Sequence, residues 1–149
     1  MKQYYSYDSF RQDTLKLLVE LKKLELDTIV GIARGGLTLA HAISEGLSLR
    51  SVQTLQTQLY DGEEKRDFLT LEGSCQLKGK KKVLVVDDIA DSGETFKAVM
   101  EYLEHHYPEI EFFSAALFYK KSSCYEPHYW INEANCWIEF FWEVDFLEK

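Results

Sequence analysis

Acidic and hydroxyl side chains stand close together in the middle of the chain, in the segment Asp87-Asp88-Ile89-Ala90-Asp91-Ser92-Gly93-Glu94-Thr95. The main-chain N–H groups of such a turn, with the hydroxyls of Ser92 and Thr95, are suited to binding a phosphate, and Gly93 lets the backbone approach it closely. The carboxylates would repel a phosphate unless sugar hydroxyls or a divalent cation lie between them. The segment therefore predicts a site for a phosphorylated sugar together with Mg²⁺.

The elements that flank this segment must hold it at the edge of a sheet. Residues 83–86 are four consecutive β-formers and predict a buried strand, which the two adjacent carboxylates end. Apolar residues then recur at helical spacing from Glu94 to about His106. A strand, turn and helix in this order place the turn at the carboxyl edge of a parallel sheet, where anions bind.

A second unit of the same kind lies earlier in the chain. Residues 28–32 predict a short buried strand, and residues 37–47 predict a helix. The turn between them, Ala33-Arg34-Gly35-Gly36, allows main-chain N–H groups to converge on an anion while the guanidinium adds charge. Paired glycines are also found in ordinary tight turns, so this segment alone does not identify a site.

The remaining elements complete an α/β pattern. An amphipathic helix is expected from about Asp8 to Glu25, with Ser6 or Asp8 as its cap, and strands are expected at 51–58 and 111–119. The polar stretch 60–74 is either a closing lid or a solvated hairpin. We predict a single domain, 1–149, with a mainly parallel sheet flanked by helices.

Composition excludes several classes of function. The net charge of −8 argues against a general nucleic-acid-binding surface, and no apolar run has the length of a membrane span. The amino terminus lacks the apolar core of a secretory signal, so a cytoplasmic protein is expected. The three cysteines, Cys75, Cys124 and Cys136, are widely spaced and fit reduced thiols better than disulfides or a zinc site.

The run from Val83 to Thr95 resembles the phosphoribosyl-pyrophosphate (PRPP) motif of type I phosphoribosyltransferases, in which apolar residues precede two acidic residues and Asp-Thr/Ser-Gly-x-Thr. The resemblance implies that Asp87 and Asp88 hold the ribose hydroxyls, that Asp88 binds Mg²⁺ and that Asp91 is the catalytic acid or base. It also implies the following PRPP-binding set: Arg34, Gly35, Asp87, Asp88, Ile89, Ala90, Asp91, Ser92, Gly93, Glu94 and Thr95.

Supporting motifs are similar to those of the xanthine-guanine type within this family. Ala33-Arg34-Gly35-Gly36 lies where the family has its pyrophosphate loop, which often contains a non-proline cis peptide, here expected at Ala33-Arg34. Leu59-Tyr60-Asp61 is similar to the start of the mobile flap, so Tyr60 and Asp61 are expected in the lid. Phe118-Tyr119-Lys120, Trp137-Ile138-Glu139 and Trp142-Glu143 are similar to the base-binding motifs. The departures from the family pattern are Ala33, Leu59, Glu94 and Glu143.

The resemblance implies an enzyme that transfers 5-phosphoribosyl from PRPP to N9 of a 6-oxopurine and works as a homo-oligomer, a dimer or tetramer. It also implies a small hood, built from terminal segments, that holds the base. Lys120 would donate to the O6 carbonyl, Trp137 would stack on the base, and the Ile138 carbonyl could accept from a 2-amino group. Simpler interpretations are that Lys120 is solvated and that Asp91 only caps a helix. The alternative functions are a non-catalytic PRPP or nucleotide sensor, a transferase for another base, and a phosphate-accepting receiver domain.

Overall fold

The computed structural model describes residues 1–59, 69–72 and 75–148. Its strands are β1 (Lys2–Tyr5), β2 (Thr28–Ala33), β3 (Val52–Leu59), β4 (Leu69–Glu72), β5 (Lys82–Val86), β6 (Ile89–Ala90), β7 (Glu111–Tyr119), β8 (Tyr129–Glu133) and β9 (Trp137–Phe140). Its helices are α1 (Tyr7–Leu21), the 3₁₀ turn η1 (Lys22–Leu24), α2 (Leu37–Leu47), α3 (Glu94–His106) and α4 (Phe141–Val144).

The main sheet has the strand order β4-β3-β2-β5-β7-β6, with β8 also paired to β7. All of these pairings are parallel except that between β3 and β4. The central strands β2 and β5 are buried on both faces, which explains their continuous apolar runs. The predicted mainly parallel α/β fold is confirmed.

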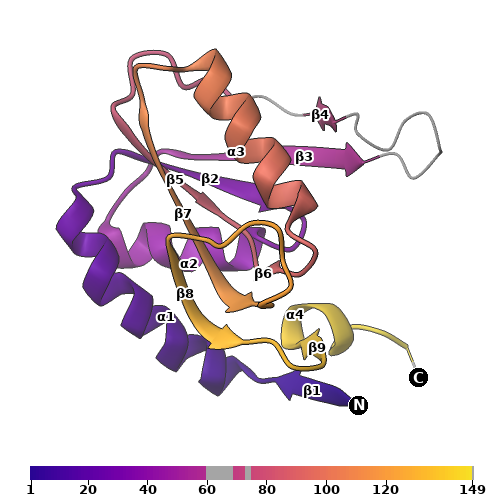
Figure 1. Ribbon diagram of the computed structural model, residues 1–149. Helices are drawn as coiled ribbons and strands as arrows, with labels where there is room; N and C mark the ends of the chain where they lie inside the picture. Colours follow the sequence, from indigo (N-terminus) through magenta and orange to yellow (C-terminus); the bar gives the residue numbers. More distant parts are fainter. Residues whose placement is uncertain (60–68, 73–74, 149) are drawn as a thin grey trace.

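Helices cover both faces of this sheet (Figure 1). On one face, α1 and α2 pack with Ile29, Leu84 and Leu117. On the other face, Phe96, Val99, Met100 and Leu103 of α3 pack with alternate strand residues such as Val30, Val83 and Val85. Because successive strand side chains point to opposite faces, the two apolar cores fix the register of the strands, and with it the positions of the turns that follow them.

Helix α1 begins as expected and ends earlier. The Ser6 hydroxyl accepts a hydrogen bond from the Ser9 N–H at 3.1 Å and caps the helix. The α-helical part ends at Leu21 rather than near Glu25, because the chain tightens into η1 and Glu25 adopts a left-handed conformation with φ 55°. This tight end leads the chain directly into β2 at Thr28.

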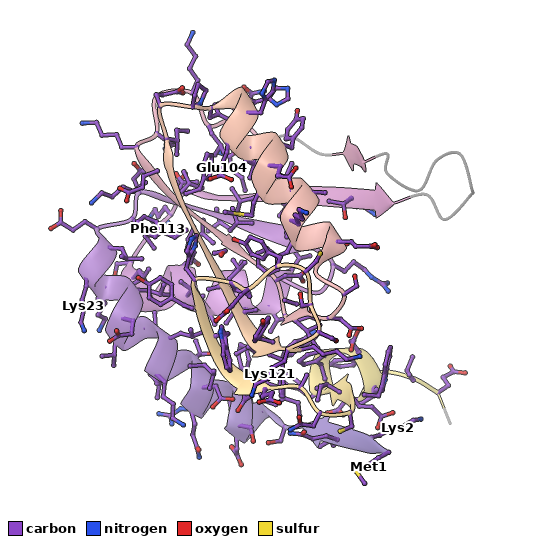
Figure 2. The ribbon with its side chains drawn as sticks, in the orientation of Figure 1. Met1, Lys2, Lys23, Glu104, Phe113 and Lys121 are labelled. Carbon is purple, nitrogen blue, oxygen red and sulfur yellow. The ribbon has the colours of Figure 1, made fainter. Side chains whose placement is uncertain are left out.

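The two ends of the chain form a second, two-stranded sheet beside the main one. β1 pairs in parallel with β9, so that Lys2 lies opposite Trp137 and Tyr5 lies opposite Phe140. Met1 and Lys2 are at the outer end of this sheet in Figure 2. The predicted hood of terminal segments is therefore present, although the sequence did not identify β1 as a strand.

Two short strands refine these expectations. Within the stretch 60–74, residues 69–72 form β4, antiparallel to β3, which agrees with the hairpin interpretation. The turn that starts at Asp91 leads into α3 as expected, but before it Ile89 and Ala90 pair with Phe118 and Tyr119 of β7, a strand that the sequence did not predict. This short pairing keeps the acidic segment attached to the sheet for two further residues.

Candidate active site

The carboxylates of Asp87 and Asp88 lie side by side at the carboxyl end of β5. Asp88 is 7% exposed, and its N–H donates to Asp87 Oδ1 at 2.8 Å. Burial raises the pKa of Asp88 to about 6. Burial and the charge of Asp88 raise the pKa of Asp87 well above its ordinary value. No salt bridge in the described part of the chain involves either side chain, so the pair is suited to meeting a cation or hydroxyl donors from outside.

The two carboxylates at this position fit Mg²⁺ that is shared with a substrate better than a metal ion whose ligands all come from the protein. Mg²⁺ commonly takes one or two carboxylates and completes its shell with water and substrate phosphate. Among the described residues, no group of three or more His, Cys, Asp or Glu side chains could hold a metal ion. Asp87 and Asp88 could therefore serve a metal that arrives with a phosphorylated substrate.

The turn after β6 forms a small pocket of about 150 Å³ lined by residues 87–93, Thr95 and Phe96. Gly93 has φ +85° and is the N-cap residue of α3, where it has no side chain to cap the helix. Ser92 Oγ accepts from the Glu94 N–H at 3.2 Å. Asp91 is therefore not the N-cap of α3, and the start of this 13-residue helix faces the pocket.

The loop after β2 lies against the acidic pair. The peptide bond Ala33–Arg34 is cis, as expected. A Cβ atom added to Gly35 would lie 2.6 Å from Asp88 Oδ2, and one added to Gly36 would lie 3.0 Å from the Cα of Asp87. Glycine at both positions thus allows the turn 33–36 to pack directly beside the end of β5. The Arg34 side chain is exposed.

A larger pocket of about 380 Å³ lies between the acidic segment and the hood. It brings together Asp88, Asp91, Lys120, Trp137 and Ile138, which the sequence had assigned to the site. Trp137 is 66% exposed and presents a free aromatic face, whereas Ile138 is buried. Glu143, from the Trp142-Glu143 motif, also lines the pocket, and further lining residues that the sequence did not assign to it are Ala134, Asn135, Cys136 and Phe140.

Lys120 reaches across the mouth of this pocket. Its Nζ lies 3.5 Å from Asp91 Oδ1, and both side chains are about half exposed. The Lys120 N–H donates to Ala90 O at 3.0 Å, which ties the end of β7 to β6. Lys120 therefore does more than extend into solvent: it pairs with the predicted catalytic carboxylate.

The structure does not bring every predicted residue into the pockets. Tyr60 and Asp61 lie outside the described residues. Arg34, Gly35 and Glu94 line neither of the two pockets, although Gly35 contacts Asp88. His41 lies on the surface of α2 in a separate groove, in agreement with a non-catalytic role. Each helix in the described part of the chain is too short or too polar to cross a membrane.

Comparisons with known proteins agree with this geometry. The chain is 28% identical over 139 residues to a xanthine-guanine phosphoribosyltransferase of Chromohalobacter salexigens, which covers 93% of this chain and 82% of that protein. The structure matches a Helicobacter pylori xanthine-guanine-hypoxanthine phosphoribosyltransferase with a TM-score of 0.89 and 36% identity, covering 97% of this chain and 96% of the other.

A purine phosphoribosyltransferase from Pyrococcus horikoshii matches with a TM-score of 0.84 and 29% identity over 99% of both chains. The sequence profile of the phosphoribosyl transferase domain covers residues 10–149. Since this match spans nearly the whole chain and the solved relatives have the same fold, the chain belongs to the phosphoribosyl transferase domain family.

Proposed function

We propose that this protein transfers the 5-phosphoribosyl group from PRPP to N9 of a 6-oxopurine, xanthine, guanine or hypoxanthine, in purine salvage in the cytoplasm. One observation carries the proposal: the small pocket at the turn and the larger pocket under the hood share Asp88, Ile89 and Asp91 as a common wall. A ribose bound along this wall would have its phosphate at the start of α3 and its C1 facing the base pocket.

On the PRPP side, main-chain donors hold the charged ends of the substrate. The turn Asp91-Ser92-Gly93-Glu94-Thr95 receives the 5-phosphate, with Ile89 and Ala90 leading into it, and the loop of Arg34 and Gly35 receives the pyrophosphate. Burial raises the pKa values of Asp87 and Asp88, and no salt bridge among the described residues neutralises either carboxylate. When bound at Asp88 with PRPP, Mg²⁺ would add positive charge beside the leaving group.

The chemical step breaks the bond from ribose C1 to the pyrophosphate oxygen and forms the bond from C1 to purine N9. Positive charge develops on the ribose ring, so the neighbouring carboxylates of Asp87 and Asp88 stabilise it. The base loses one proton overall, and Asp91 can accept or return that proton at N7. Pyrophosphate carries away the bonding electrons of the broken C1–O bond.

On the base side, selectivity comes from side chains around the larger pocket. The Lys120 ammonium donates to the O6 carbonyl and has no acceptor to offer the amino group of adenine. Trp137 stacks on the ring, and the Ile138 carbonyl accepts from a 2-amino group. In the free protein Asp91 satisfies Lys120, so binding of a 6-oxopurine replaces one partner of this ammonium with another.

A turnover assay tests the proposal. Purified protein is incubated with PRPP, Mg²⁺ and one base at a time, hypoxanthine, xanthine, guanine, adenine, uracil or orotate, and released pyrophosphate is measured. We expect release with 6-oxopurines only. PRPP binding without release would favour the sensor, release with another base would favour a different transferase, and light scattering would test the expected homo-oligomer.

A further inference from the structure

The segment between β7 and β8, residues 120–128, lies directly behind the phosphate-binding turn. In Figure 1 it curves beside β6 and the first turn of α3. The Cys124 N–H donates to Ser92 O at 2.8 Å, and a Cβ on Gly93 would lie 2.7 Å from Tyr125 N and 2.9 Å from Cys124 N. The backbones of the two segments are thus in direct contact.

The contact at Ser92 fixes a donor on the other side of the same peptide unit. In a trans peptide the N–H points opposite to the C=O. Because the Ser92 carbonyl faces Cys124, the Gly93 N–H faces away from the segment 120–128. The small pocket lies on that side, since it is lined by Ser92 and Gly93 and by no residue of 120–128. Accepting a hydrogen bond at the carbonyl also strengthens the N–H of the unit as a donor.

A partly buried cluster of hydrogen bonds holds the segment in place. Ser114, in the middle of β7, is fully buried, and its Oγ lies 2.7 Å from the Tyr125 hydroxyl. The Ser114 N–H donates to His128 Nδ1 at 2.9 Å, and the His128 N–H donates to Ser114 Oγ at 3.0 Å. The Tyr125 ring stacks on Phe96 in the first turn of α3, with ring centroids 5.2 Å apart.

We propose that Ser114, Tyr125 and His128 are positioning residues for PRPP: through the segment 120–128 they aim the Gly93 N–H at the phosphate of the substrate. This proposal rests on the proposed function, because the phosphate concerned is that of PRPP. None of the three residues lines either of the two pockets of the site. Lys120, at the start of the segment, is held separately by its N–H bond to Ala90 O, so the effect of the three residues is exerted on affinity for the phosphate and not on the chemical step or on base recognition.

Tyr125→Phe and Ser114→Ala test the proposal, because each removes a hydroxyl without adding bulk. Loss of the hydrogen bond lets the segment shift, and we expect PRPP to bind about three- to tenfold more weakly in each variant. The KM for PRPP rises accordingly, while kcat and the KM for hypoxanthine at saturating PRPP change by less than about twofold. Since the two hydroxyls share one bond, the double variant binds PRPP no more weakly than Ser114→Ala alone.

Two further measurements separate positioning from a general loss of stability. Inorganic phosphate is titrated while the Gly93 amide is followed by NMR, and its shift should be smaller and its apparent Kd weaker in Tyr125→Phe. Tyr102→Phe is the matched control, because Tyr102 lies on the exposed side of α3 away from this cluster.

Unchanged PRPP affinity in folded Tyr125→Phe and Ser114→Ala would overturn the proposal, as would an equal rise in the KM for PRPP and for the base. Failure of the proposed function looks different, because the wild type would then release no pyrophosphate with any base. Binding of PRPP and of inorganic phosphate to wild type and variants would still decide the positioning proposal in that case.

Discussion

The two halves of the site differ in the groups that they offer to a ligand: main-chain groups on the phosphate side and side chains on the base side. The phosphate side consists of two turns, the segment from β5 to the first turn of α3 and the loop after β2, and it offers main-chain groups at Gly93, packed against the backbone of Cys124 and Tyr125, and at Gly35, packed against Asp88. The base side is assembled from β9, α4 and the end of β7, and it offers side chains, of which Trp137 and Lys120 are more than half exposed.

This difference implies a division of labour. Main-chain donors are the same whatever the side chains are, so the phosphate side binds the feature common to all PRPP reactions. Side chains can discriminate, so the choice of base is left to the hood. Substitutions on the two sides should therefore change different kinetic constants, and the predictions below are ordered by the size of the expected effect.

The largest effect is expected at the boundary of the two halves, in Asp91→Asn. The amide keeps the shape of the turn and its N–H groups, so PRPP should still bind, but the proton acceptor is lost. Turnover should fall by about 10²–10⁴-fold. Single-turnover kinetics with PRPP and hypoxanthine measure this, and binding of PRPP by calorimetry is the control. Turnover near that of the wild type would show that Asp91 is not the acid or base.

On the phosphate side, Asp88→Asn should make the metal-free protein more stable. The pKa of Asp88 is raised to about 6 in the folded protein from an ordinary 3.8, so the unfolded chain loses its proton first as pH rises. The contribution of Asp88 to the free energy of unfolding is therefore fully present below about pH 4 and is lost as the pH rises towards 6. At pH 8, the free energy of unfolding of Asp88→Asn should exceed that of the wild type by about 1–3 kcal/mol.

The measurement is chemical unfolding of both proteins without Mg²⁺ at pH 4.5 and pH 8. The difference in free energy of unfolding between the wild type and Asp88→Asn should be small at the lower pH and large at the higher pH. The same substitution should abolish Mg²⁺-dependent binding of PRPP, because it removes the expected ligand. A variant that is less stable than the wild type at pH 8 would contradict the unpaired charge that we assign to this position.

On the base side, Lys120→Ala should reduce kcat/KM for hypoxanthine by about 10–100-fold and leave the low rate with adenine unchanged. The half-exposed ammonium is partly screened by water, so the loss is smaller than for a fully buried donor. Lys121→Ala is the matched control, because Lys121 pairs with Glu133 outside the pocket. Equal use of adenine and hypoxanthine by the wild type would refute the role of Lys120.

The same contrast explains which parts could be predicted from the sequence. The turns at 33–36 and 87–95 lie within short strand-turn-helix units, so residue types and spacing predicted where both turns lie, although 33–36 was assigned to the site only through its resemblance to the family's pyrophosphate loop. The hood depends on pairing between Lys2–Tyr5 and Trp137–Phe140, at opposite ends of the chain, which no local period reveals. β6 has only two residues, too few to show alternation, and the support from 120–128 depends on contacts across the sheet.

The smallest effect, and the most direct test of the division, is expected in Tyr5→Phe. The Tyr5 hydroxyl donates to Asp13 Oδ2 at 2.7 Å in a buried position, and Asn132 Nδ2 donates to the same oxygen at 2.8 Å. The ring packs edge-on against Phe118 and Phe140, with centroids 5.0 and 5.7 Å away. Tyr5 thus joins the hood to α1 and β8.

Removal of this hydroxyl leaves the ring contacts and the Asn132 bond in place, so the hood should loosen without unfolding. We expect the KM for hypoxanthine to rise about two- to fivefold, with the KM for PRPP unchanged and a stability loss of about 1–2 kcal/mol. Tyr4→Phe is the control on the same strand, because the Tyr4 hydroxyl bonds to Asp145 at the exposed surface. This pattern is the reverse of that expected for Tyr125→Phe. If Tyr5→Phe instead raises the KM for PRPP as much as that for hypoxanthine, the phosphate side and the base side do not act independently, and the proposed division between them is wrong.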